Sequence, residues 1–524
     1  MKTLQIKSIG SFMIIGWIVV LASCEKDFLD LENPNDITAA TFFETQDQVQ
    51  QAVNTLYPAM VGVRLSENGG VFQQNSRSGE SQITAGAFDV QVSYYNFQNT
   101  PESGSTDALW ESLYTMIYRA NTILANMDRV DWSGGEEIQT KLTAEIHFFR
   151  GLGYFYLAHL YGQVPIVTKP AETDEEFNPA KADNVGAVYD QAISDLQIAK
   201  AGLPEEQEDP GRATKGAATG FLGKTYLYRA GYLGEENYYA LAAAEFKEVI
   251  DLGIYDLVSN FEDNFTAANE NNEESLFELQ LLFNPGLGTP TQARPFNSVP
   301  GIGFEIFLRP SSWLMETMAQ EKTVNDEFDP RYLQTIYFDG GLPLFGVPYD
   351  QLGDGIACEG GRGVGNAPDG SSTKIGGWWR KYLNVDLSCE PVLTGSEPGN
   401  NERILRYADI LLMYAEAIIL SGGNMAEANN ALARVRNRAQ LPEKSFTNED
   451  ELMGEVRHQR IMEFAYENTH YFDLIRWNLL GESLSDHGTS IQVASYDPLK
   501  HKYFPIPTSE INNNLNLEQN EGWQ

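Results

Sequence analysis

Two helical segments that share one spacing of small and large residues constrain this chain more than any other feature. Leu-Gly-x-x-Tyr occurs at residues 152–156, inside the apolar stretch AEIHFFRGLGYFYLAHLYG, and again at residues 222–226. A small residue on an apolar helix face lets a second helix approach, and the large neighbours fill the groove between the two. The core is therefore expected to consist of packed helices.

A second segment with matching spacing follows each of these helices. The residues are Ala192, Leu196, Ala199 and Pro204 after the first helix, and Ala242, Phe246 and Val249 after the second. The second helix of a further repeat is indicated by Ala428, Leu432 and Val435. Both pairs match the helix–turn–helix signature of a tetratricopeptide repeat. Chance matching among alanine-rich helices is the alternative, and it would require two paired coincidences. The sequence predicts helical repeats at about 107–283 and 401–480.

Two long regions interrupt this pattern. Residues 64–106 are rich in Gly, Ser, Asn and Gln, and residues 284–400 hold many glycines and prolines with few long helical periods. Long loops in compact domains are often functional. No segment has the composition of a linker that would divide the chain, so residues 45–524 are expected to form a single domain.

The N-terminus carries a targeting signal. An apolar block over residues 9–22 follows Lys2 and Lys7 and is shorter than the roughly 20 residues that span a bilayer. It ends in Leu-Ala-Ser-Cys, which resembles a bacterial lipobox, so residues 1–23 are predicted to be a lipoprotein signal peptide and Cys24 to be lipidated. Residues 24–44 would then be the tether and first segment. An ordinary cleaved signal with a chance cysteine is the alternative.

Charge excludes one class of partner. The chain has 36 Lys and Arg against 73 Asp and Glu, a formal net charge of −37. Binding to a polyanion requires clustered cations that displace counterions, so nucleic acid is not an expected partner. An anionic membrane surface would also repel the chain, which leaves a covalent lipid as the expected attachment. Solubility or a salty habitat accounts for the acidity.

The other two cysteines, Cys358 and Cys389, flank a glycine-rich segment. Outside the cytoplasm they are a possible disulfide, and two free thiols are the alternative. Their spacing is too wide for a zinc-binding Cys-x-x-Cys pair.

Catalytic and cofactor motifs are not found in the sequence. Gly223-Lys224-Thr225 resembles the end of a phosphate loop, but Ala218 stands where the earlier glycine belongs. The six histidines form no His-Glu-x-x-His pair, no Gly-x-Ser-x-Gly elbow occurs, and no calcium-loop pattern is present. The sequence therefore predicts no catalytic residues, no metal and no cofactor. Among 73 acids a carboxylate pair is uninformative.

Several charged residues lie within apolar helices, and buried charges must be paired. They are Arg406, Asp409, Glu416, Arg460, Glu463, Glu467, Asp473 and Arg476. A catalytic acid–base pair is one interpretation, and an internal ion-pair network that ties helices together is the preferred one. Alanine at Glu463 is then expected to impair folding rather than to alter ligand preference.

Several long motifs carry a family resemblance. RYADILLMYAEA, RVRNRA, RHQRIMEFAYENTHYFDLIRW and YFPIPTSEIN resemble the C-terminal half of the SusD/RagB family. FLDLENPNDITAATFF, LWESLYTMIYRANTIL and AEIHFFRGLGYFYLAHLYGQVPIV resemble its N-terminal half. The resemblance covers nearly the whole chain after Cys24 and weakens at 64–106 and 284–400.

The resemblance implies a SusD-like fold, mainly α, in which a tetratricopeptide-like scaffold faces a partner and a large loop-rich insertion carries the ligand. It also implies a lipoprotein on the extracellular side of the outer membrane of a Bacteroidota-type bacterium. Such a protein binds oligosaccharides without catalysis and delivers them to a SusC-like TonB-dependent transporter. A peptide-binding member of the family, a surface glycoside hydrolase and a pure protein-interaction scaffold remain as alternatives.

Sugars stack on flat aromatic faces, and amides and cations take their hydroxyl groups. The ligand-binding candidates are Tyr94, Tyr95, Asn96, Phe97, Tyr349, Trp378 and Trp379. One of the two adjacent tryptophans is expected to be core, because the segment that follows them resembles a core strand of the family. Trp313 is also expected in the core, and Arg64 and Arg77 are a candidate basic patch.

Overall fold

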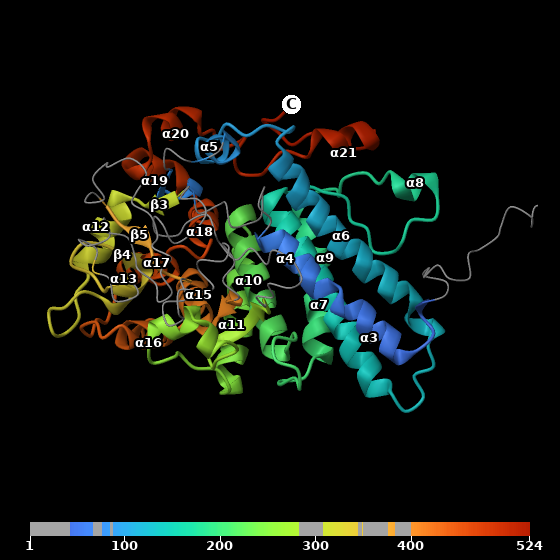
Figure 1. The fold of residues 1–524 in the computed structure, drawn as a ribbon, viewed down its shortest axis with the longest axis horizontal. Coiled ribbons are helices and arrows are strands. Elements are labelled where there is room, and N and C mark those ends of the chain that lie inside the picture. Colours follow the sequence, from blue (N-terminus) through green and yellow to red (C-terminus); the bar gives the residue numbers. More distant parts are fainter. Residues whose placement is uncertain are drawn as a thin grey trace, which may run out of the picture.

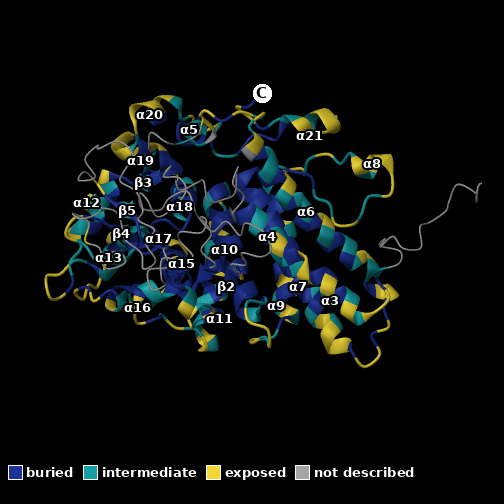
Figure 2. Ribbon diagram, viewed as in Figure 1, coloured by how far each residue is buried: buried dark blue, intermediate teal, exposed yellow. Residues whose placement is uncertain are grey.

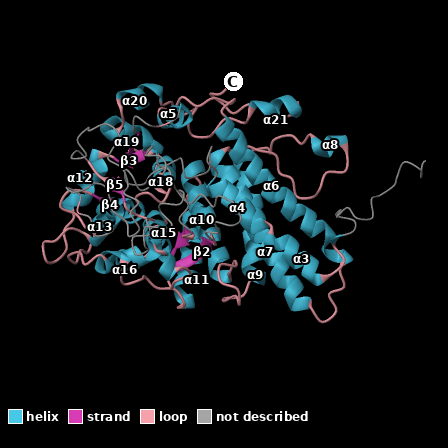
Figure 3. Ribbon diagram, viewed as in Figure 1, coloured by secondary structure: helices cyan, strands magenta, loops and turns pink. Residues whose placement is uncertain are grey.

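The computed structural model describes residues 42–65, 76–83, 87, 89–281, 308–343, 348, 376–382 and 400–524. Helices make up most of this part of the chain, and short two-stranded sheets join them (Figures 1 and 3). The prediction of a mainly α fold is confirmed. Within the described ranges, no helix is both long and apolar enough to cross a membrane.

The first described helices are α3 (Gln46–Asn54) and α4 (Leu56–Leu65). Thr45 caps α3, because its hydroxyl accepts from the Gln48 backbone N–H while the Gln48 side chain accepts from the Thr45 backbone. Val49 and Val53 are buried on the inner face of α3, and α4 packs along α6 (Gly104–Asn126). The capping motif therefore fixes where α3 begins.

The central layer is a series of long helices in chain order. After α6 come α7 (Glu136–Leu160), α9 (Val185–Gly202), α10 (Lys215–Leu233) and α11 (Asn237–Leu252). Helix α7 packs against α6 and α9, and α10 packs against α9 and α11, as Figure 1 shows. Each helix thus buries two faces, which explains why α7 and α10 are apolar almost all round.

Glycines set the spacing of these helices. A Cβ atom at Gly223 would lie 2.7 Å from Cε1 of Phe246 on α11, so the second repeat pair packs as its spacing predicts. In the first pair, a Cβ at Gly151 would lie 2.9 Å from Cγ of Leu196 on α9. Gly153 instead faces Ile117 of α6, because residues two apart lie on nearly opposite sides of a helix.

The C-terminal helices complete the core. They are α15 (Tyr407–Leu420), α16 (Met425–Arg438), α17 (Glu449–Phe464) and α18 (His470–Arg476). Helix α15 is buried on nearly every side and packs on α11, α16 and α17 (Figure 2). Ala428, Leu432 and Val435 are buried on α16, which packs against α15, as the repeat spacing predicts.

Short elements link the two halves. Strand β2 (Ser275–Leu279) pairs antiparallel with β6 (Glu402–Arg406), which leads directly into α15. The 3₁₀ helices η3 (Met127–Arg129), η4 (Phe261–Phe265) and η5 (Ala267–Asn269) and the helix α8 (Asp174–Phe177) lie in connections.

The regions expected to be loop-rich contain short regular elements in their described parts. Residues 64–106 include β1 (Ser81–Ile83) and α5 (Asp89–Tyr95). The later region includes β3 (Leu308–Pro310), α12 (Ser312–Gln320), α13 (Pro330–Thr335), β4 (Ile336–Tyr337) and β5 (Trp378–Trp379). A second hydrophobic core lies among them, with Phe261, Phe265, Trp379 and Tyr466 as members. A continuous loop over 64–106 is therefore a wrong expectation.

The C-terminal segment crosses the end of α7. It includes α19 (Leu480–His487), α20 (Ser490–Ser495) and α21 (Thr508–Asn513). The Phe504 backbone N–H donates to the Leu160 carbonyl at 2.7 Å. Asn520 Nδ2 donates to the carbonyls of Tyr161 and Phe504, each at 2.8 Å. Residues late in the chain therefore satisfy the open carbonyls at the end of α7.

Candidate functional site

Four short strands, β1, β3, β4 and β5, lie close in sequence to parts of the chain outside the described ranges. Strand β1 pairs antiparallel with β3, from Ser81 opposite Pro310 to Ile83 opposite Leu308. Strand β4 pairs with β5, and β3 contacts β5. These strands, with α12 and α13, gather at one end of the molecule (Figure 1). Binding residues are often held at such positions by a rigid scaffold, so the side chains around these strands are the first candidates for a site.

The aromatic group predicted at the first connection is buried. Tyr94, Tyr95, Asn96 and Phe97 all lie inside, at the C-terminal end of α5 and just after it. Tyr496 and His501 contact the Phe97 ring edge-on, each with a centroid distance of 5.3 Å. The four side chains are covered because α5 packs its end against the C-terminal segment, and their role as ligand contacts stays a prediction.

Arg77 organises this group. Its guanidinium carbon lies 4.4 Å from the centroid of Phe97, and the rings of Tyr94, Tyr471 and Phe504 surround it. Its Nε donates to the Tyr94 carbonyl at 3.1 Å. Its Nη2 donates to Asn99 Oδ1 at 2.9 Å. We call Arg77, Tyr94, Phe97 and Asn99 the Arg77 cluster.

Arg64 and Arg77 do not form a basic patch on the protein surface. Arg77 is buried, and so is Arg64, whose Nη2 donates to Glu402 at 2.7 Å. A buried guanidinium that is paired or enclosed by rings contributes little positive potential at the surface. The basic-patch expectation is therefore wrong for both residues.

Two hydrogen-bond donors of the Arg77 cluster are unsatisfied within the described residues. Arg77 Nη1 and Asn99 Nδ2 are buried and have no hydrogen-bond acceptor in the part of the chain that the structure describes. They belong to two side chains that are already joined by a hydrogen bond, so they lie close together. A buried donor without an acceptor is costly, typically by about 1–3 kcal/mol. A water molecule between the two side chains would supply the missing acceptor.

The tryptophans divide into core and surface. Trp379 is buried and stacks on Tyr466 with a centroid distance of 4.5 Å, which agrees with one of the pair being core. Trp378 is half-buried beside it on β5. Trp313, which was expected in the core, is only partly buried and packs against the second core.

Trp313 is part of an aromatic stack that the sequence did not reveal. Its ring lies parallel to the exposed His487 ring at 4.3 Å and to the buried His470 ring at 5.9 Å. Ser311 caps α12 by accepting from the Leu314 backbone, which places Trp313 in the first turn. The two histidines come from α19 and α18, far along the chain, so no local spacing could have indicated the stack.

The charged residues of the apolar helices form two buried ion-pair networks, as the preferred interpretation predicts. In the first, Glu463 accepts from Arg438 at 2.6 Å, from Arg406 at 3.0 Å and from Arg331 at 3.3 Å. Arg406 also contacts Glu467 at 2.8 Å and Glu274. The three arginines hold the pKa of Glu463 far below its ordinary value, although burial acts in the opposite direction.

The second network joins α10, α15, α17 and α18. Arg460 donates to Asp409 and Asp473, each at 2.7 Å, and Lys224 Nζ donates to Asp409 at 2.9 Å. Arg476 pairs with Asp473 at 2.7 Å and with Glu416. Lys224 of the phosphate-loop look-alike is therefore in the middle of a helix and bound to a carboxylate. These contacts support structural roles for the whole set.

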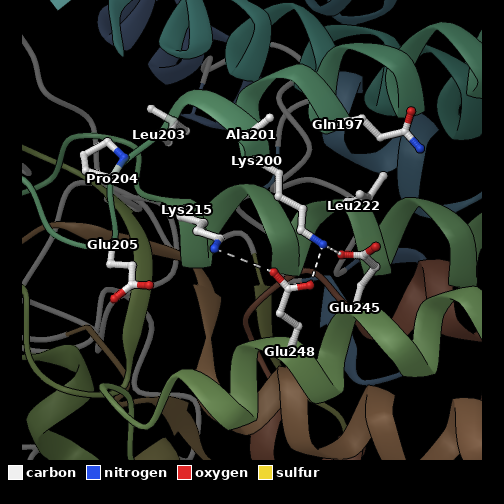
Figure 4. A pocket seen from close by; sticks show the side chains of 10 residues that line it. All are labelled: Gln197, Lys200, Ala201, Leu203, Pro204, Glu205, Lys215, Leu222, Glu245 and Glu248. Atoms are coloured by element: carbon white, nitrogen blue, oxygen red, sulfur yellow. Dashed lines mark hydrogen bonds and ion pairs between the residues drawn. The ribbon is translucent and has the colours of Figure 1, made fainter. Parts of the chain in front are cut away.

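One groove lies on the repeat surface between α9, α10 and α11 (Figure 4). It encloses about 580 Å³. Lys200 reaches across it to Glu245 at 2.7 Å and Glu248 at 2.6 Å, and Lys215 lies 4.0 Å from Glu248. The lysines of the groove face its own carboxylates, so these ion pairs join α9 to α11.

The remaining predicted residues lie outside the described ranges. They are Cys24, Tyr349, Cys358 and Cys389, together with the predicted signal peptide, residues 1–23. Among the residues that are described, no group of three or more His, Cys, Asp or Glu side chains could hold a metal ion.

The fold is that of a helical-repeat scaffold with an elaborated, loop-bearing end, and comparisons identify its family. The sequence profile described as "SusD family" matches residues 294–523, and the profile described as "Starch-binding associating with outer membrane" matches residues 27–227. The chain belongs to the SusD/RagB family.

Individual relatives agree with this assignment. A SusD-like protein of Bacteroides ovatus is 27% identical over 484 residues, covering 88% of this chain and 80% of the relative. The starch-binding protein SusD of Bacteroides thetaiotaomicron is 27% identical over 427 residues, covering 73% of this chain and 72% of the relative.

Solved structures share the fold. A SusD superfamily protein from Bacteroides vulgatus superposes with a TM-score of 0.78 at 26% identity and covers 92% of this chain and 100% of its own. A laminarin-binding SusD-like protein superposes with a TM-score of 0.71 at 25% identity and covers 91% of this chain and 100% of its own. The predicted tetratricopeptide-like SusD fold is confirmed.

Proposed function

We propose that this protein captures oligosaccharides at the cell surface and delivers them to a SusC-like TonB-dependent transporter in the outer membrane. The observation that carries the proposal is the presence of two partly exposed tryptophan rings, Trp313 on α12 and Trp378 on β5, beside the short strands of a SusD-family fold. Relatives named for starch and laminarin binding support glycan as the ligand class.

The chemistry of the described site suits a sugar. The apolar C–H face of a sugar can lie against an aromatic ring, and side-chain amides and cations can bond its hydroxyl oxygens. Trp313 and Trp378 are partly exposed and provide such rings near the same strands. A site built from a few stacked rings and hydrogen bonds is expected to bind in the micromolar to millimolar range and to release quickly, which suits transfer to a transporter.

The attachment and architecture follow from the sequence. Cys24 is proposed to carry the lipid after removal of residues 1–23, with residues 24–44 as tether and first segment and residues 45–524 as one domain. Cys358 and Cys389 are proposed to pair, because both would lie outside the cytoplasm. The protein would then face the outside of the cell and act by binding, without catalysis.

Affinity electrophoresis and calorimetry against neutral polysaccharides, acidic polysaccharides and peptides test the proposal. We expect retardation by at least one neutral glycan and no release of reducing ends. Trp313→Ala and Trp378→Ala should each weaken binding about tenfold or more, which corresponds to the loss of one good stacking contact. Tyr118→Ala is the matched control, because Tyr118 is an exposed aromatic on α6 of the scaffold.

Each rival function has its own outcome in this experiment. Binding only to peptides would support the peptide-binding alternative, and reducing ends that vanish with one carboxylate variant would support a glycoside hydrolase. Absence of binding to every glycan and peptide would favour a pure interaction scaffold and overturn the proposal.

A further inference from the structure

Glu80 connects three elements at the loop-bearing end. It lies immediately before β1 and is completely buried. Its carbonyl accepts from the backbone N–H of Ser311, the cap of α12, at 2.9 Å. Its Oε1 accepts from the backbone N–H of Tyr466, after α17, at 3.3 Å. Glu80 therefore contacts α12 through its backbone and the α17–α18 turn through its side chain.

His470 faces Glu80 from the start of α18. Its Nδ1 lies 3.6 Å from Glu80 Oε2, and its ring stacks on Trp313. Glu80 Oε2 and His470 Nδ1 are both buried, and neither has a hydrogen-bond partner in the described structure. The neighbouring hydroxyl oxygens Ser81 Oγ and Thr469 Oγ1 are also buried and have no hydrogen-bond partner among the described residues. The pair is thus a polar contact that is not locked by other hydrogen bonds.

We propose that Glu80 and His470 are a positioning pair: both are held neutral, and in that state they keep Trp313 and α12 in place for ligand binding, so that ionisation of either one loosens the loop-bearing end. The effect on ligand rests on the proposed function. The effect on the fold does not, and it can be measured without any ligand.

The surroundings of Glu80 favour its protonated form. Burial is the main cause that raises its pKa, to about 8, and the carboxylates of Glu467 and Asp473 act in the same direction. The Tyr466 N–H and the Lys381 ammonium oppose them. At neutral pH the Glu80 carboxyl is therefore uncharged.

The surroundings of His470 favour its neutral form. Burial lowers the pKa of its imidazole to about 4, and the Arg460 cation and the neighbouring His487 ring act in the same direction. Asp473 opposes them. The two partners therefore stay neutral between about pH 4 and pH 8, and each leaves that state at the opposite end of the range.

The sign of each contribution to stability follows. Glu80 has a raised pKa in the folded protein, so its contribution is complete below the unfolded value of about 4.3 and is lost as pH rises through about 8. His470 has a lowered pKa, so its contribution is present above about 6.5 and is lost as pH falls through about 4. A purely structural role would change stability equally at every pH.

Thermal unfolding of the full chain between pH 4 and pH 9 tests the pair. The thermal midpoint of Glu80→Gln minus that of wild type should increase by about 2 °C or more as pH rises from 5 to 9. The same difference for His470→Phe, which keeps an aromatic ring beside Trp313, should increase by a similar amount as pH falls from 7 to 4. Glu482→Gln, at an exposed acid of α19, is the control and should run parallel to wild type. Parallel curves for both pair variants would overturn the proposal, and because each variant tests one end of the range, failure of one to fold leaves the other decisive.

Calorimetry with the glycan that binds best at pH 7 tests the link to ligand. We expect the wild-type association constant to fall about threefold or more between pH 7 and pH 9, and that of Glu80→Gln to stay level. An equal fall in both proteins would overturn the link. If no glycan binds at any pH, the proposed function fails, while the thermal curves still decide whether the pair titrates.

Discussion

Removal of the Glu463 carboxylate should destabilise the protein without altering its ligand preference. Glu463 is completely buried and contacts three guanidinium groups, those of Arg438, Arg406 and Arg331, at 2.6–3.3 Å. In Glu463→Gln the side chain keeps its shape and one acceptor oxygen but loses its charge. Each arginine retains another carboxylate, yet three buried cations are left with less compensation.

The magnitude follows from the behaviour of buried ion pairs. Breaking such a pair from one side costs about 3–5 kcal/mol, and hydrogen bonds to charged groups contribute about 1.5–3 kcal/mol each. We therefore expect a loss of about 3–5 kcal/mol in the free energy of unfolding. In a domain of this size each kcal/mol corresponds to about 1 °C, so the thermal midpoint should fall by about 3–5 °C.

Differential scanning calorimetry with a denaturant series measures this loss. Glu451→Gln is the matched control, because Glu451 is exposed on the first turn of the same helix and should cost about 1 kcal/mol or less. The pKa of Glu463 is lowered in the folded protein, so its contribution is present above its unfolded pKa and fades as pH falls below about 4. A loss as small as the control's, or an unchanged midpoint with an altered glycan preference, would refute the structural role.

Two further predictions concern packing and pH. Gly153→Ala should cost about 1–3 kcal/mol in thermal unfolding, because its Cβ would lie 2.9 Å from Ile117 Cγ1, whereas Gly454→Ala on α17 has open space and should stabilise by about 0.5–1 kcal/mol. A loss in both would contradict the close-approach argument. Glu321 accepts from His458 at 2.7 Å, which is the main cause that lowers its pKa to about 2. Because the Glu321–His458 pair is partly exposed to solvent, Glu321→Gln should cost only about 1–2 kcal/mol at pH 6. Urea unfolding at lower pH should show this difference vanish between about pH 4.5 and pH 2, and a constant difference would contradict the prediction.

Local sequence pattern was sufficient for the scaffold. The repeat spacing predicted that Gly223 packs against Phe246, because both residues lie on one helix pair and the geometry depends on few variables. The charges of α15 and α17 predicted their own pairing, because buried ions of opposite sign within apolar helices have few other partners.

The candidate site depends on contacts between distant parts of the chain, and here pattern alone failed. Phe97 is buried by residues close to position 500, and Trp313 meets His487 from another helix. A polar, aromatic-rich stretch such as 94–97 has the composition of an exposed loop whether or not a later segment covers it. The burial of Arg77 by four rings likewise could not be inferred from its neighbours in sequence.

The closure of α7 by residues 504–520 has a consequence for the order of folding. In the described structure the carbonyls of Leu160 and Tyr161 accept from Phe504 and Asn520, which are synthesised long after α7. The end of α7 must therefore remain uncapped until residues 504–520 have been synthesised. Such a delay would keep the growing chain open to chaperones, and a premature stop near position 500 would produce a product that proteases can recognise.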